Sequence, residues 1–306
     1  MYKKILVPLD GSDLAECVLP YVESLASAED KVSITFLYVI TIDIPLASQK
    51  YKSSIEADAR SGAESYLKRL FAKLKYKDIA TSVITTGKAA EAIVDYADKE
   101  NIDLIIMATH GRSGLSRWSH GSVADKVLHN SKIPVWLINS NAIKRTFPRK
   151  GHKISILIPL DGSKLAEGVL KHVNALSSQM GKENVDIHIF RAVELFAPPF
   201  IYPPEMPINL EEYLQYEKKR AVAICAEYLQ KVLRKTEKEG LQASYATLEG
   251  NPADVIIDYA NKKDIDFIVM STHGRTGISR WAFGSIAEKV MQSSPCPVFI
   301  VRSWIK

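Results

Sequence analysis

Two copies of a segment rich in glycine and hydroxyl groups are the part of this sequence best suited to chemistry. Residues 105–128 read IIMATHGRSGLSRWSHGSVADKVL, and residues 268–291 read IVMSTHGRTGISRWAFGSIAEKVM. In each copy a glycine and a later Gly-Ser pair lie between an apolar run and a helical pattern: Gly111, Gly121 and Ser122 in the first, Gly274, Gly284 and Ser285 in the second. The amides at a helix N-terminus carry partial positive charge, so this arrangement predicts a duplicated phosphate site. Arg112 and Arg275 could add positive charge.

A second pair of segments places an aspartate directly after a short apolar run. Residues 8–12 read PLDGS, and residues 159–163 repeat them. Proline ends the run, glycine permits a tight turn, and serine can cap a following helix. Two interpretations of Asp10 and Asp161 stay open. Each is either a turn-forming side chain or a carboxylate that binds a hydroxyl or amine of a ligand.

His110 and His273 are the two histidines that occur in both copies. No second histidine, cysteine or carboxylate accompanies them at the spacing of metal ligands, so we predict no protein-built metal site. A hydrogen-bonding or stacking role beside a ligand and a purely structural role both remain open. The apolar residues of the segments 38–40 and 191–193 could line a flat pocket.

Apolar runs alternate with helical patterns through each copy. Strands are expected at 5–9, 32–39, 81–86, 104–108 and 135–138, and helices from about residue 12 and at 57–74, 91–99 and 122–130. Continuous apolar runs that alternate with helices indicate parallel sheets covered on both faces. The predicted fold class is therefore α/β, with two tandem doubly wound (Rossmann-like) five-stranded parallel-sheet domains. Ligands of such folds bind at the carboxyl ends of the strands.

The duplication also predicts the domain boundaries. We expect one domain at 1–142, a linker at 143–152 and a second domain at 153–306. Basic residues gather at this linker and are expected to be solvated: Lys144, Arg145, Arg149, Lys150 and Lys153. The second copy carries a proline-rich segment at 196–207, for which a surface insertion, a lid and a partner-docking arm are all open.

Composition and missing motifs exclude several classes of protein. The net charge of +5 over 306 residues is a mild excess, so no nucleic-acid partner is expected. No apolar run approaches the roughly 18 residues of a membrane span, and no signal peptide is evident. We therefore expect no membrane association and a cytoplasmic location. A Walker A loop, a G-x-G-x-x-G fingerprint and a repeated Ser-His-Asp or Cys-His constellation are all missing from the sequence.

Both copies resemble universal stress protein domains of the ATP-binding type, over nearly the whole chain. The nucleotide motif of that family is G-x2-G-x9-G-[S/T]. It corresponds here to Ala108, Gly111, Gly121 and Ser122, and to Ser271, Gly274, Gly284 and Ser285. The first glycine of the motif is replaced in both copies by another small residue.

The resemblance implies ATP bound across the carboxyl edge of the sheet, with Mg²⁺ beside its phosphates. Pro8 and Pro159 would flank the site, and Asp10 and Asp161 would lie near the ribose and adenine. Val39 and its counterpart Ala192 would meet the adenine, and the glycines and Gly-Ser pairs would cradle the triphosphate beside His110, Arg112, His273 and Arg275. The resemblance also implies that the last strands, 135–138 and 298–301, pair to form an intrachain pseudo-dimer, with a further homodimer of chains.

Three hypotheses about function follow. The leading one is a tandem universal stress protein that binds ATP and acts as a nucleotide-dependent stress-response sensor or regulator. The second is an enzyme on the same fold, a slow ATPase or a nucleotidyl transferase. Weak ATP hydrolysis at most is expected, because no repeated general base is evident. The third is an interaction scaffold that binds no nucleotide.

Overall fold

The computed structural model describes residues 1–26, 32–42, 51–109, 121–139, 146–194, 210–272 and 283–302. The first half of the chain holds β1 (Lys4–Leu9), α1 (Leu19–Leu25), β2 (Ser33–Ile40), α2 (Lys52–Lys73), β3 (Ala80–Thr86), α3 (Ala89–Lys99), β4 (Leu104–Ala108), α4 (Ser122–Asn130) and β5 (Val135–Ile138). The second half holds β6 (Ile154–Pro159), α5 (Lys164–Glu167), α6 (Leu170–Met180), β7 (Val185–Val193), α7 (Leu210–Lys238), β8 (Gln242–Glu249), α8 (Pro252–Lys262), β9 (Phe267–Ser271), α9 (Ser285–Ser293) and β10 (Val298–Val301). Short 3-10 helices lie at Ala15–Val18, Lys77–Ile79 and Lys182–Asn184.

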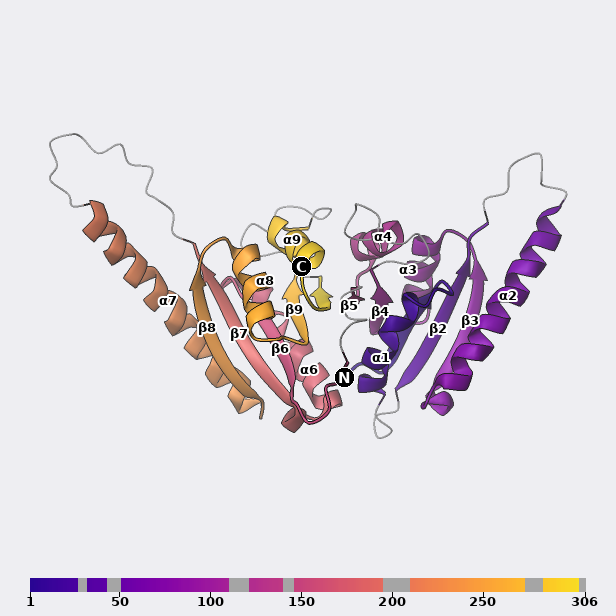
Figure 1. Cartoon of the computed structure of the whole chain (residues 1–306), viewed down its shortest axis with the longest axis horizontal. Helices are drawn as coiled ribbons and strands as arrows, with labels where there is room; N and C mark the ends of the chain where they lie inside the picture. Colours follow the sequence, from indigo (N-terminus) through magenta and orange to yellow (C-terminus); the bar gives the residue numbers. More distant parts are fainter. Residues whose placement is uncertain are drawn as a thin grey trace.

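The ten strands of these described ranges belong to one sheet, in the order β3-β2-β1-β4-β5-β10-β9-β6-β7-β8. Within each half every paired neighbour is parallel. Each half thus has the doubly wound order 3-2-1-4-5, whose topological switch point lies between its first and fourth strands. The predicted fold class is confirmed. Figure 1 shows the two halves side by side, with α2 and α7 at the outer ends.

Helices cover both faces of the sheet because the strands are apolar on both sides. In β1, Ile5 and Val7 pack into one buried cluster and Leu6 packs into the other. The first cluster also takes residues from α1, α2, α6 and α7, and the second takes residues from α3, α4, α8 and α9. Strands that are buried on both faces explain the continuous apolar runs of the sequence.

The sequence expectation was wrong about where two helices begin. After β1 the chain makes a turn at Ser12, whose carbonyl accepts the amide of Ala15 at 3.1 Å, and α1 begins only at Leu19. Pro20 lies in the first turn of α1, where its missing N–H costs no hydrogen bond. α2 begins at Lys52, five residues before the expected start at residue 57.

The two halves join through their last strands. β5 and β10 pair antiparallel, with Val298 opposite Leu137 and Ile300 opposite Val135. Trp136 of β5 is fully buried at this join. Its ring centroid lies 4.7 Å from that of Phe267 and 5.9 Å from that of Phe299, both in the second half. The predicted pairing of the last strands within the chain is confirmed.

The amino-terminal residues contribute a second contact between the halves. The amide of Tyr2 donates to Oε1 of Gln179 at 2.7 Å, and Nε2 of Gln179 donates to the carbonyl of Tyr2 at 3.0 Å. The Tyr2 hydroxyl lies 2.6 Å from Nδ1 of His172. Two side chains of α6, His172 and Gln179, therefore form hydrogen bonds with a residue of the other half.

The described part of the predicted linker is docked onto the protein. The Phe147 ring stacks on that of Tyr21 at a centroid distance of 4.2 Å and is buried. Arg149 forms ion pairs with Asp264 and, at 3.2 Å, with Asp266. The expectation of a solvated cluster is therefore wrong for Arg149, whereas Lys150 and Lys153 are exposed. Lys144 and Arg145 lie outside the described residues.

Replacement of Trp136 should disrupt the join between the halves. Trp136→Ala leaves a cavity among aromatic rings from both halves and should lower the free energy of unfolding by about 3–5 kcal/mol in denaturant titrations. Ile55→Ala is the control, because Ile55 is 39% exposed on α2 and its truncation should cost less than about 0.5 kcal/mol. Equal effects of the two substitutions would contradict this account of the join.

The contact at His172 should make stability depend on pH. Burial, followed by the charges of Lys171 and the N-terminus, lowers the pKa of His172 from 6.5 to about 4. The unfolded chain therefore takes up a proton at this site at a higher pH than the folded chain does, so acidification below 6.5 favours unfolding. Between pH 7 and 5 wild type should lose roughly 1 kcal/mol more stability than His172→Gln, after allowance for solvent screening. Chemical denaturation at both pH values measures the difference, and parallel losses would argue against it.

Candidate functional site

A cavity of about 310 Å³ opens at the carboxyl ends of β1 and β4, at the switch point of the first half. Its volume is at the lower end of the range of small-molecule sites. Fifteen residues line it: Pro8, Leu9, Asp10, Ala15, Leu37, Val39, Ala89, Ile93, Met107, Ala108, Thr109, Gly121, Ser122, Val123 and Ala124. The cavity therefore draws on β1, β2, α3, β4 and α4.

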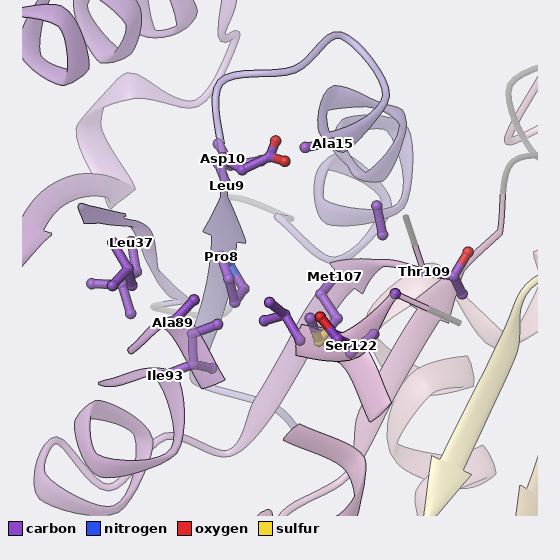
Figure 2. A pocket seen from close by; sticks show the side chains of 15 residues that line it. Pro8, Leu9, Asp10, Ala15, Leu37, Ala89, Ile93, Met107, Thr109 and Ser122 are labelled. Carbon is purple, nitrogen blue, oxygen red and sulfur yellow. The ribbon is translucent and has the colours of Figure 1, made fainter. Parts of the chain in front are cut away.

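The walls of the cavity differ in chemistry from side to side. Figure 2 shows the Asp10 carboxylate near the tip of β1 and the hydroxyls of Thr109 and Ser122 on another side. Leu37, Ala89 and Ile93 provide an apolar side. A ligand with one flat apolar part and one polar or anionic part would match these surroundings.

Asp10 forms the turn that follows β1. Its Oδ1 accepts hydrogen bonds from the amide of Ser12 at 3.0 Å and from the Ser12 hydroxyl at 2.7 Å. Asp161 accepts from the amide of Ser163 at 2.9 Å in the same way. The turn-forming interpretation therefore holds for both aspartates, and Asp10 lines the cavity as well.

The glycines of the Gly-Ser pairs, at the N-termini of α4 and α9, form backbone hydrogen bonds with the residues that follow β4 and β9. The Gly121 amide donates to the carbonyl of Thr109 at 2.6 Å, and the Gly284 amide donates to that of Thr272 at 2.9 Å. A Cβ on Gly284 would lie only 3.2 Å from the Thr272 oxygen. Close contact between two backbone segments therefore favours glycine at position 284, independently of any ligand.

The first turn of α4 faces the cavity without a side-chain cap. Gly121 is the N-cap residue and makes no capping hydrogen bond from a side chain, and Ser122, Val123 and Ala124 line the cavity. The N-cap of α5 differs, because Oγ of Ser163 accepts from the Ala166 amide at 3.1 Å. A helix start of the α4 kind attracts anions through its amides and its dipole.

A buried tyrosine, Tyr66, lies near the acidic groups Glu16 and Asp10 of the first half. Burial, and then the Glu16 and Asp10 carboxylates, raise the pKa of Tyr66. Tyr228 has a raised pKa in the second half, again through burial, then Glu167 and further Asp161, while Arg191 opposes the shift. Both hydroxyls are therefore neutral at physiological pH.

Several predicted site residues lie outside the described part of the chain. These are His110, Gly111 and Arg112 of the first copy and His273, Gly274 and Arg275 of the second. The proline-rich segment 196–207 lies outside it too. Of the first copy, the structure places Pro8, Asp10, Val39, Ala108, Gly121 and Ser122 around one cavity.

The second half places Pro159, Asp161, Ala192, Ser271, Gly284 and Ser285 at the matching positions, but its surroundings differ. Strand register sets Phe190 opposite Pro159, where the first half has Leu37 opposite Pro8. The next residue is Arg191 in place of Tyr38. Its guanidinium lies 5.0 Å from the Tyr228 ring, and its Nη1 is 2.9 Å from where a Cβ on Gly162 would be.

The sequence analysis missed several residues that line the cavity, among them Leu37, Ala89, Ile93, Met107 and Thr109. Only Thr109 carried a usable signal, since it begins the repeated Thr-His-Gly-Arg. The others are apolar residues of ordinary strand and helix patterns, and only the strand order brings them together.

Comparison with known proteins identifies the family. The family model described as the universal stress protein family matches residues 1–139 and 155–302, so this chain belongs to that family. It is 32% identical over 175 residues to universal stress protein MJ0531 of Methanocaldococcus jannaschii, covering 56% of this chain and 96% of that protein. It is 23% identical to a universal stress protein of Mycolicibacterium smegmatis, over 97% of this chain and 96% of the relative.

A solved structure shares the tandem architecture. The crystal structure of a universal stress protein from Archaeoglobus fulgidus aligns with a TM-score of 0.66 at 22% identity, covering 98% of this chain and 96% of that one. This likeness supports the fold. Among the helices of the described ranges, none combines the length and apolar character needed to cross a membrane.

The turn at Asp10 can be tested without a ligand. Asp10→Ala removes the acceptor of two hydrogen bonds and should lower the free energy of unfolding by about 1–2 kcal/mol. Asp10→Asn keeps an Oδ1 acceptor and should lose less than half as much. Urea titration measures the free energy of unfolding of both variants. An Asp10→Asn variant as unstable as Asp10→Ala would contradict this account of the turn.

Proposed function

We propose that the cavity of the first half binds an adenine nucleotide, ATP with Mg²⁺, and that the protein is a nucleotide-dependent regulator of a stress response. The observation that carries the proposal is the meeting of three features in one cavity. These are the apolar side, the Asp10 carboxylate and the start of α4 without a side-chain cap.

Each part of the nucleotide has a matching part of the cavity. The adenine lies against the apolar side formed by Leu37, Val39 and Ile93. Asp10 accepts a hydrogen bond from a ribose hydroxyl or from the adenine amine. The phosphates extend towards Gly121 and Ser122, where the amides of α4 and the serine hydroxyl stabilise negative charge. Mg²⁺ enters with the phosphates and takes oxygen ligands from them.

Regulation would follow from the position of the site. A ligand that binds the native state stabilises it, by about 2.7 kcal/mol at a concentration one hundred times the dissociation constant. ATP in this cavity bridges β1, β2, β4, α3 and α4, so occupancy orders the carboxyl edge of the first half. A partner that recognises this edge would then distinguish the occupied protein from the empty one.

Other expectations stay predictions. They are the second site at Pro159, Asp161, Ala192, Ser271 and Gly284-Ser285, and the roles of His110, Gly111, Arg112, His273, Gly274 and Arg275. They also include the domain boundaries at 142 and 153, a homodimer, a cytoplasmic location and weak ATP hydrolysis at most.

Blocking the cavity tests the proposal. Val39→Trp places a large side chain against the proposed adenine position and should weaken ATP binding at the first site at least tenfold in equilibrium dialysis with labelled Mg-ATP. Ala192→Trp makes the same change in the second half and reports whether that half binds. Ile55→Trp, on the exposed face of α2, is the control for an added indole. Wild type that binds no ATP at millimolar concentration, or Val39→Trp that binds as wild type does, would refute the proposal.

A further inference from the structure

A residue of the second half of the chain forms hydrogen bonds with the C-terminal end of α4. Arg302 directly follows β10, and its Nη1 donates hydrogen bonds to the carbonyl of His129 and, at 3.3 Å, to that of Ser131. These carbonyls end α4, whose start lines the cavity of the first half. Phe283, also from the second half, packs on the His129 ring at 4.4 Å.

The matching position of the first half carries a neutral residue. Ile138 pairs with Ala108 and Val301 with Ser271, so Asn139 and Arg302 directly follow equivalent strand ends. Nδ2 of Asn139 donates to the carbonyls of Ser294 at 3.0 Å and Cys296 at 2.9 Å, just beyond the end of α9. Each half thus caps the corresponding helix of the other, but only α4 receives a charged cap.

A cation at the C-terminal end of a helix affects the potential at its other end. α4 has nine residues and is therefore about 13.5 Å long. A positive charge beside its last carbonyls opposes the negative end of the helix dipole, and its own Coulomb potential adds to the positive potential at the N-terminal end. Arginine keeps its charge at neutral pH, and half-burial of Arg302 reduces screening by water.

We propose that Arg302 is a positioning residue for the nucleotide site of the other half. Through α4 it fixes the helix start that faces the phosphates and raises the positive potential there. This inference rests on the proposed function, and it makes phosphate affinity in the first half depend on a residue of the second half.

The test separates phosphate affinity from general stability. It uses the full chain carrying Ala192→Trp, so that binding reports the first site, and calorimetric titration with Mg-ATP and with adenosine. Arg302→Asn installs the residue that the chain itself uses at position 139, and Arg302→Gln is a second neutral variant with hydrogen-bond donors. Arg302→Lys keeps the charge.

Both neutral variants should bind ATP about three- to tenfold more weakly than the parent, because the lost charge acts on several phosphate charges over about 15 Å. Adenosine affinity should change less than twofold, and Arg302→Lys should recover most of the ATP affinity. Equal losses for ATP and adenosine, unchanged ATP affinity, or loss of folding in both neutral variants would overturn the inference. A parent chain that binds neither ligand would instead refute the proposed function.

Discussion

The antiparallel pairing of β5 with β10 is the contact on which the rest of this structure depends. Each of these strands is only four residues long, and alone it would leave an unprotected sheet edge in its half. Pairing removes both edges and buries Trp136 among aromatic rings of the two halves. It also brings α4 and α9 near the join, where residues that follow each strand reach the helix of the other half.

The two halves share a backbone plan but differ in their side chains. Each has the same strand order, the same Asp-centred turn and the same Gly-to-Thr loop closure. Phe190 stands where the first half has Leu37, Arg191 where it has Tyr38, and Pro252 where it has Ala89. The same turn conformation thus occurs beside two different sets of side chains. The carboxyl edges of the two halves need not bind the same ligand.

The glycines at the start of α4 and α9 take part in backbone contacts of the fold. The amide of each glycine closes a loop onto a threonine carbonyl, and a Cβ on Gly284 would crowd that oxygen. The same choice removes any capping side chain from the helix start, which leaves the amides of α4 facing the cavity. The backbone contact that closes the loop and the absence of a side-chain cap therefore coincide at one residue type.

Local patterns in the sequence predict the duplication, the alternation of strands and helices, and the bounds of elements such as β4, α4 and β5. These follow from local periodicity, apolar runs and turn residues, which act over a few positions of the chain. The helix after β1 was predicted, but its start was placed too early, at about residue 12, because a turn at Ser12 precedes it and α1 begins only at Leu19.

Which residues come into contact depends on the way the elements pack together. The strand order brings Leu37, Ile93 and Met107 to one cavity, although each belongs to an ordinary apolar pattern. The docking of Arg149 onto the second half and the reach of Arg302 to α4 are contacts between residues more than a hundred positions apart. Such contacts depend on how the two halves of the sheet join, and no local pattern in the sequence encodes that arrangement.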